Sequence, residues 1–207
     1  MTDRSAHWGN VWSTKSADAV SWYQPEPTVS LALIDAVGLG TDDPIVDVGA
    51  GASTLVDGLL ARGFRDVTLL DVAAEAFEAT RRRLAGRDAG RVAYVATDVT
   101  RWAPERSYAL WHDRAVFHFL TDEADRAAYG AALAHALRPG GAAVIATFAD
   151  DGPERCSGLP VRRYAEAALA AELAPWLTLV EARRETHRTP GGSEQRFVYG
   201  RFQRSGA

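Results

Sequence analysis

The sequence predicts an α/β protein with a doubly wound, mostly parallel sheet of seven strands, helices on both faces and a C-terminal antiparallel hairpin. Two observations carry this prediction. Five short apolar strands alternate with helical segments between residues 44 and 173, and such alternation is typical of a parallel sheet covered on both faces. Two further extended stretches then flank the segment 189–193, whose proline and glycines indicate a hairpin turn.

Residues 1–27 are expected to form an N-terminal cap. The segment holds several aromatic residues among polar ones, which is too aromatic for a disordered tail. Pro25 and Pro27 then interrupt the chain before the next helix. The aromatic residues are Trp8, Trp12, Trp22 and Tyr23.

The rest of the chain, residues 28–207, is expected to be a single domain. A helix starts at Thr28, since apolar residues follow at helical spacing, and Gly38 ends it. We predict strands near residues 44–48, 67–71, 91–96, 107–112, 142–148, 176–187 and 194–203, and helices near residues 53–62, 73–85, 121–137 and 160–173.

Composition excludes several classes of protein. The 207 residues are 47% hydrophobic, which allows a sizeable core, and no apolar run approaches the ~20 residues needed to cross a bilayer. A net charge of -4 argues against a nucleic-acid surface. The only cysteine, Cys156, permits neither an intramolecular disulfide nor a cysteine-based metal cluster. We expect a cytoplasmic protein with no membrane, nucleic-acid or metal partner.

The loop after the first strand has the residues of a nucleotide cradle. Gly49 and Gly51 remove side chains where backbone must approach a ligand, and Ser53 opens the next helix. A dinucleotide fingerprint needs a third glycine at the sixth position, where this chain has Thr54. The chain also lacks the Gly-Lys-Ser or Gly-Lys-Thr of a phosphate-binding loop. The spacing therefore weakens the nicotinamide interpretation and excludes a P-loop.

Acidic residues follow the first three strands in order. Asp47 precedes the first loop glycine by two, Asp71 ends the second strand, and Asp98 follows the third. A carboxylate such as that of Asp71 can accept hydrogen bonds from two ribose hydroxyls, although it could instead cap the helix near Ala73. With the terminal hairpin, this order resembles the class I S-adenosylmethionine-dependent methyltransferases over roughly residues 28–203.

The resemblance implies a cofactor, S-adenosylmethionine, and the residues that hold it. Asp71 would bind the ribose, Asp98 and the backbone of Val99 the adenine, and Asp47 the methionyl amino group. A structural aspartate at position 47 is the alternative. The full predicted cofactor set is Asp47, Gly49, Ala50, Gly51, Ser53, Asp71, Val72, Asp98, Val99 and Asp113.

The segment after the fourth strand is the predicted catalytic edge. His118 lies in a Phe-His-Phe-Leu stretch similar to one in small-molecule methyltransferases, so it is the first candidate for a general base, with His112 second. A buried structural histidine is the alternative at position 118. Asp113 and Arg114 could pair, or Arg114 could bind an acceptor carboxylate. The predicted acceptor contacts are Trp22, Tyr23, Arg114, Phe117, Arg155 and Cys156.

The predicted function is methyl transfer to a nitrogen, oxygen or sulfur nucleophile of a small molecule, with S-adenosylhomocysteine as product. Residues 113–116 are also similar to a segment of protein-lysine methyltransferases, so lysine in a protein is the first alternative acceptor. A non-catalytic cofactor-binding module is a second alternative, and a nicotinamide-dependent oxidoreductase is a third.

Overall fold

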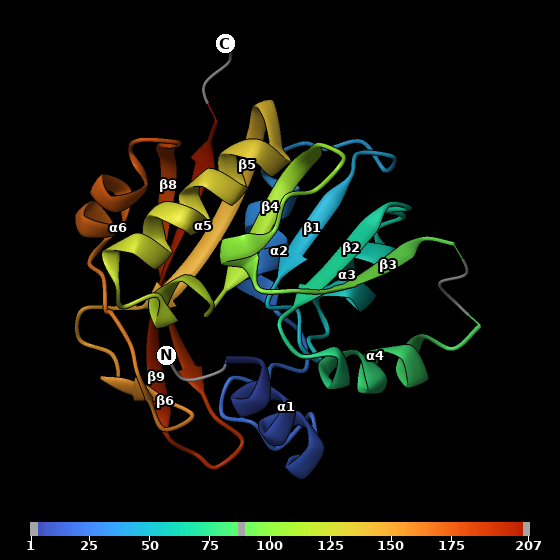
Figure 1. Cartoon of the computed structure of the whole chain (residues 1–207), viewed down its shortest axis with the longest axis vertical. Coiled ribbons are helices and arrows are strands. Elements are labelled where there is room, and N and C mark those ends of the chain that lie inside the picture. Colours follow the sequence, from blue (N-terminus) through green and yellow to red (C-terminus); the bar gives the residue numbers. More distant parts are fainter. Residues whose placement is uncertain (1–3, 87–89, 205–207) are drawn as a thin grey trace.

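The computed structural model describes residues 4–86 and 90–204 (Figure 1). The ends of the predicted cap and domain, residues 1–3 and 205–207, lie outside this range. The helices are α1 (Arg4–Thr14), α2 (Thr28–Asp35), α3 (Leu55–Ala61), α4 (Phe77–Leu84), α5 (Glu123–Ala136) and α6 (Glu166–Leu173), with short 3-10 turns η1 (Ala74–Ala76), η2 (Val99–Arg101) and η3 (Phe117–Phe119). The strands are β1 (Ile45–Val48), β2 (Val67–Asp71), β3 (Val92–Ala96), β4 (Tyr108–Arg114), β5 (Leu137–Phe148), β6 (Arg155–Cys156), β7 (Leu159–Pro160), β8 (Thr178–Arg188) and β9 (Glu194–Gln203).

The predicted fold class is confirmed. Within the described residues, one sheet has seven strands in the order β3-β2-β1-β4-β5-β9-β8. Strands β1 to β5 are parallel, whereas β9 runs antiparallel to both β5 and β8. The chain winds outward from β1 to β3 and then returns to place β4 on the other side of β1. A reversal of this kind leaves a crevice at the carboxyl ends of the strands, where open α/β sheets bind ligands.

Helices cover both faces of the sheet because the central strands are apolar on both sides. In Figure 1, α5 and α6 lie on the near face and α2 and α3 on the far face. Tyr129 and Leu133 of α5 pack on one face with Trp111 of β4. Leu31 of α2 and Leu59 of α3 pack on the other. All five side chains are buried.

The predicted helix at 160–173 begins six residues late, at Glu166. The segment between β5 and this helix contains a small hairpin, in which Arg155 pairs with Pro160 and Cys156 with Leu159. Residues 155–160 therefore form two short strands and a turn rather than helix. The amide of Tyr164 donates to Phe148 O at 3.1 Å. The predicted helix at 73–85 is likewise divided into η1 and α4.

Helix α1 lies beneath the carboxyl edge of the sheet, beside α4 and the far end of the β8–β9 hairpin (Figure 1). Arg4 on this helix pairs with Asp98 at 3.1 Å and with Asp125. The ring of Trp12 covers the glycine loop, since a Cβ on Gly51 would come within 2.6 Å of it. These contacts fix α1 across the crevice.

The segment after α1 is attached to the terminal hairpin. His187 Nε2 donates to Ser21 O at 2.8 Å, and Gln195 Nε2 donates to Ser21 Oγ at 3.3 Å. Gln24 Nε2 donates to Glu185 at 2.8 Å. The N-terminal segment is thus packed on the same sheet that carries the crevice. Among the described helices, none is long and apolar enough to span a membrane.

A first prediction concerns the glycine loop. Gly49 has φ +67° and a Cβ there would overlap Val116 Cγ2, whereas Gly38 has φ +76° and open space around it. Gly38→Ala should lower the free energy of unfolding by about 1–2 kcal/mol, the cost of the left-handed backbone. Gly49→Ala should cost about 1–3 kcal/mol more, because the new methyl group must displace Val116. Equal losses for the two variants in urea unfolding would contradict the close approach at Gly49.

Candidate active site at the strand ends

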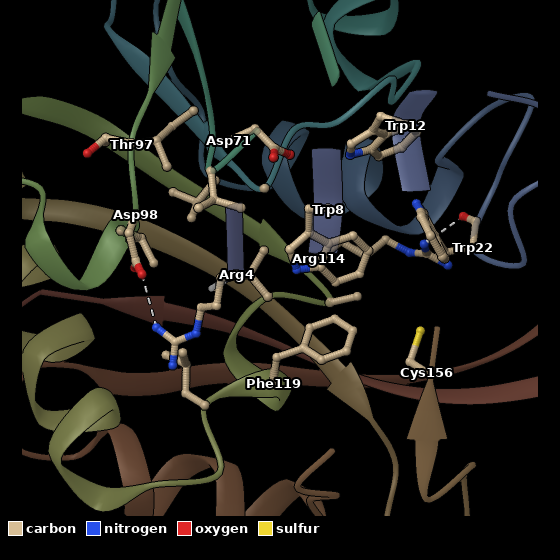
Figure 2. A pocket seen from close by; sticks show the side chains of 18 residues that line it. Arg4, Trp8, Trp12, Trp22, Asp71, Thr97, Asp98, Arg114, Phe119 and Cys156 are labelled. Carbon is tan, nitrogen blue, oxygen red and sulfur yellow. Dashed lines mark hydrogen bonds and ion pairs between the residues drawn. The ribbon is translucent and has the colours of Figure 1, made fainter. Parts of the chain in front are cut away.

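A cavity of about 780 Å³, part of it open to solvent, lies between the carboxyl ends of β1–β4 and helix α1 (Figure 2). The strands bring polar residues to it, whereas α1 and the segment after it bring aromatic ones. Its walls are Arg4, Trp8, Trp12, Trp22, Val48, Gly49, Leu70, Asp71, Val72, Thr97, Asp98, Val99, Arg114, Ala115, Val116, Phe119, Leu120 and Cys156.

Asp71 ends β2 and lines the cavity, and its carboxylate also binds the backbone of the glycine loop. Its Oδ2 accepts from the amide of Gly51 at 2.9 Å and its Oδ1 from the amide of Ala73 at 3.0 Å. Burial raises the pKa of Asp71 to about 6 against the opposing effect of these amides, and the charge of Asp47 adds to the rise. Asp71 therefore accepts from the backbone of the turn after β2, as a capping residue would, and it also lines the cavity.

Asp98 follows β3 and lies near the end of the cavity where Arg4 enters (Figure 2). Its Oδ1 accepts from the amide and hydroxyl of Thr100, at 2.9 and 2.8 Å, and its Oδ2 accepts from Arg4. Burial opposes ionisation, but the hydrogen bonds from Thr100 and Arg4 hold the pKa of Asp98 below its ordinary value. The cavity therefore has an ionised carboxylate at this end.

A buried chain of hydrogen bonds connects β1, β4 and α2. Asp47 and His112 are register partners in adjacent strands, and His112 Nδ1 lies 2.7 Å from Asp47 Oδ1. His112 Nε2 lies 2.9 Å from Ser30 Oγ. The other carboxylate oxygen, Asp47 Oδ2, is buried without a hydrogen-bond partner. Because an unpaired buried carboxylate oxygen is costly, this site favours a ligand that donates to it.

Asp47 and His112 line a second hollow that adjoins the cavity at Gly49. Predicted cofactor residues Ala50 and Ser53 line it too, as does the predicted acceptor contact Tyr23. Trp22 borders both spaces. The two hollows together follow the strand ends from β3 to β4.

Arg114 at the end of β4 is held from three sides. Nε donates to Tyr199 Oη at 2.8 Å, and Nη1 donates to the carbonyl of Trp22 at 3.0 Å. Nη2 makes no hydrogen bond and lies 3.7 Å from Glu185 Oε2. The guanidinium also lies over the ring of Phe197, 4.3 Å from its centroid. The side chain is thus fixed in place with one donor nitrogen unused.

His118 is not brought to the cavity. It is fully buried, and its ring packs against Phe119 and Phe148 at centroid distances of 4.5 and 4.7 Å. Nδ1 accepts from the amide of Phe148 at 3.2 Å. Burial, with a smaller effect of Arg114, lowers the pKa of His118 to about 3. The general-base expectation for His118 is therefore corrected, because a neutral histidine of the core cannot reach an acceptor in the cavity.

Three other predicted site residues also lie away from the cavity. Asp113 is fully buried and accepts from the amides of Val116 and Phe117, at 2.8 and 3.1 Å, so it shapes the turn after β4 rather than contacting a ligand. Phe117 is a core residue. Arg155 is exposed and bonds the carbonyl of Gly158. Asp113 and Arg114 do not pair with each other, since Arg114 turns toward Glu185.

Several wall residues were missed by the sequence interpretation. Arg4, Trp8 and Trp12 recur every four residues, and that spacing places side chains on one face of a helix. A helical pattern search over residues 4–14 would have found this face. Ser30 and Phe119 had no such signal, because only the tertiary fold brings α2 to His112 and η3 to the cavity.

Comparisons with known proteins agree with this geometry. Residues 45–141 match the family described as "Methyltransferase domain". Residues 45–141 are a methyltransferase domain. None of the curated proteins matches the chain in sequence.

Solved structures share the fold of this methyltransferase over nearly its whole length. A 1,6-didemethyltoxoflavin-N1-methyltransferase from Burkholderia thailandensis is 24% identical, with a TM-score of 0.71 over 97% of this chain and 84% of that one. The N-methyltransferase NodS from Bradyrhizobium japonicum WM9, in complex with S-adenosylhomocysteine, is 18% identical, with a TM-score of 0.70 over 95% and 97%. A structure described as "Conversion of a Disulfide Bond into a Thioacetal Group during Echinomycin Biosynthesis" gives 20% identity and a TM-score of 0.75 over 97% and 93%.

The predicted enzyme class is confirmed for residues 45–141, which match a methyltransferase domain, and the whole sheet has the class I fold. S-adenosylmethionine is the methyl donor of that class. The residues present fit this cofactor. The unpartnered Asp47 Oδ2 suits an ammonium group, and Gly49 lines the cavity without a side chain. Asp71 and Asp98 add acceptors along the same edge.

A second prediction tests the core position of His118 in the methyltransferase. Below about pH 6.5 the unfolded chain protonates this histidine while the folded chain, with its lowered pKa, does not. The unfolding free energy that His118 contributes should therefore decrease as pH falls from about 7 to about 4.5. His118→Asn keeps an acceptor for the Phe148 amide and lacks this titration. In urea unfolding, the unfolding free energy of the wild type should therefore fall relative to that of the variant as pH decreases. A difference between the two free energies that stays constant with pH would contradict the buried, neutral state of His118.

Proposed function

We propose that the enzyme transfers a methyl group from S-adenosylmethionine to a nitrogen, oxygen or sulfur nucleophile of a small molecule. The observation that carries the proposal is the roof that α1 forms over the strand ends. Trp12 lies on Gly51 and Trp8 lies against Phe119, with ring centroids 5.1 Å apart. A cavity roofed by aromatic rings suits a compact acceptor better than an extended peptide.

The cofactor would lie along the carboxyl ends of β3, β2 and β1. Asp98 and Val99 would hold the adenine beside Val72, Asp71 the ribose, and Asp47 the methionyl ammonium. The backbone from Gly49 to Gly51 and Ser53 would lie against the methionine part. The bound cofactor supplies a methyl group on a sulfonium, which is already a strong electrophile.

The chain's own residues then position the acceptor and exclude water. Methyl transfer is an in-line displacement, so holding the two reactants at the right distance and angle supplies much of the rate. Trp22 borders both hollows, and an aromatic face near a positive charge is attractive. The roof of α1 would exclude water from part of the site, which strengthens these electrostatic contacts.

The neighbours' acceptors support a small molecule. The Burkholderia enzyme is described with bound 1,6-didemethyltoxoflavin, and it covers 97% of this chain. Protein-lysine methylation, the first alternative from the sequence, has no comparable support. We also propose that the enzyme is cytoplasmic, because a chain with one cysteine, Cys156, forms no internal disulfide. From its charge of -4 we expect no nucleic-acid partner.

Tritium transfer from labelled S-adenosylmethionine into a host-cell extract tests the proposal. The extract is separated into small-molecule and protein fractions after incubation with the enzyme. We expect enzyme-dependent label in the small-molecule fraction. Label confined to protein, or no transfer at all, would contradict the proposed acceptor class.

A third prediction concerns pH. Ribose hydroxyls need the ionised form of Asp71, whose pKa is raised to about 6 by burial. Affinity for S-adenosylhomocysteine should be constant above this pH and should fall as pH drops through about 6. Asp71→Asn should bind about 1.5–3 kcal/mol more weakly at pH 7.5, the scale of a hydrogen bond to a charged group, without this pH dependence. A pH-independent affinity of the wild type in calorimetry would remove Asp71 from ribose binding.

A fourth prediction separates Asp47 from Asp71 with two ligands. Methylthioadenosine has the adenine and ribose of S-adenosylhomocysteine but no amino acid part. Asp47→Asn should weaken binding of S-adenosylhomocysteine by roughly 1.5–3 kcal/mol and leave methylthioadenosine unaffected, whereas Asp71→Asn should weaken both. Equal losses for the two ligands with Asp47→Asn would show that this aspartate acts only on the loop.

A further inference from the structure

The order of the strands determines where the acceptor lies in the cavity. On the proposed function, the cofactor occupies the ends of β3, β2 and β1, because Asp98, Asp71 and Asp47 stand there. The remaining part of the cavity borders β4 and the hairpin after β5. This part, which we call the acceptor end, is lined by Trp8, Trp22, Arg114, Phe119 and Cys156 (Figure 2).

The acceptor end is lined by aromatic rings set nearly perpendicular to one another. Trp8 and Trp22 have centroids 5.8 Å apart at an interplanar angle of 81°, and Trp8 and Phe119 are 5.1 Å apart at 75°. Rings in this arrangement offer both faces and edges to a flat ligand, and such pairs are favourable beyond the area they bury. The shape therefore favours a planar aromatic molecule.

Arg114 is the one charged side chain among the five residues of the acceptor end. Arg114 lines it with a side chain that is only 10% exposed and with Nη2 unused as a hydrogen-bond donor. Its partner Glu185 is not a wall residue and is occupied by Tyr199 Oη at 2.7 Å and by Gln24 at 2.8 Å. A cationic acceptor would face this guanidinium and the cofactor's sulfonium together, so the site favours neutral or anionic molecules.

Among the described residues, no histidine or carboxylate lines the acceptor end. Burial raises the pKa of the Cys156 thiol to about 11, so the thiol stays protonated at neutral pH. His118 lies in the core, and both ring nitrogens of His112 are engaged by Asp47 and Ser30. The enzyme therefore offers no base at the place where an acceptor would lose a proton.

We propose that the acceptor is a planar aromatic or heteroaromatic molecule without positive charge, whose nucleophile is a ring nitrogen lone pair or a ring-bound oxygen or sulfur that ionises in solution. This inference rests on the proposed function and narrows it. The lone pair of the nucleophile forms the bond to the methyl carbon while the carbon–sulfur bond breaks and leaves its electron pair on sulfur. No proton has to move, and Arg114 Nη2 donates to the aromatic ligand.

A panel of model acceptors with tritiated S-adenosylmethionine tests this inference. Quinoline supplies a ring nitrogen and ring-substituted thiophenols supply sulfur nucleophiles that ionise at different pH. Benzylamine is the matched control, since it has the aromatic ring but an ammonium group at neutral pH. We expect label in quinoline or the thiophenols and none in benzylamine. The inflection of the pH profile of kcat/KM should move with the thiophenol used.

Variants separate the role of Arg114 from general folding. Arg114→Gln should raise KM for the aromatic acceptor roughly tenfold or more, because one buried charged donor is lost, and should change the affinity for S-adenosylhomocysteine by a much smaller factor. Arg183→Gln, on the exposed part of β8 beside Glu181, is the matched control and should change neither. If Arg114→Gln does not fold, Trp8→Leu should weaken acceptor binding as measured by quenching of tryptophan fluorescence with S-adenosylhomocysteine present.

Three outcomes would overturn the inference: methylation of benzylamine as fast as of the other acceptors, a pH inflection that stays fixed when the thiophenol changes, or no methylation of any panel member. Label in the small-molecule fraction of the extract together with a failed panel would leave the proposed function standing and reject only this acceptor class. Label in protein alone would reject both.

Discussion

The contact between Asp47 and His112 is the constraint on which the site depends. It joins the two central strands at the point where the winding of the sheet reverses, and Ser30 extends it to α2. Because His112 occupies one carboxylate oxygen, the other is left buried without a partner, in a residue that lines the second hollow. A polar chain at this depth is favourable only when each member has its partner, which is why we propose that a ligand donates to Asp47.

The N-terminal segment covers part of this open edge. Trp12 covers the glycine loop, Arg4 reaches Asp98, and the following residues bind the terminal hairpin through Ser21 and Gln24. The N-terminal segment and the turn of the β8–β9 hairpin therefore meet at the carboxyl edge (Figure 1). Arg114 links them, since it donates to the carbonyl of Trp22 and to Tyr199 of β9. Cofactor space and acceptor space are consequently shaped by the same contacts.

Much of the fold follows from local sequence, and less of the site does. Apolar strands and glycine-terminated helices predicted the sheet and its hairpin, and strand-end carboxylates such as Asp71 lie at the cavity as expected. His118 sits on the predicted edge in sequence, yet η3 turns it into the core. The strands of the β6–β7 hairpin are two residues each, too short for a periodic signal. Long-range partners such as Ser30 leave no local pattern, because packing of α2 alone creates them.

Calorimetric titration of the purified wild-type protein with S-adenosylhomocysteine, with NADH as the comparison ligand, tests the central claim most directly. The arrangement of Asp47, Asp71 and Asp98 along the strand ends predicts saturable binding of one S-adenosylhomocysteine per chain and no binding of NADH. Absence of S-adenosylhomocysteine binding, or binding of NADH in its place, would contradict the assignment of this edge as the methyl-donor site.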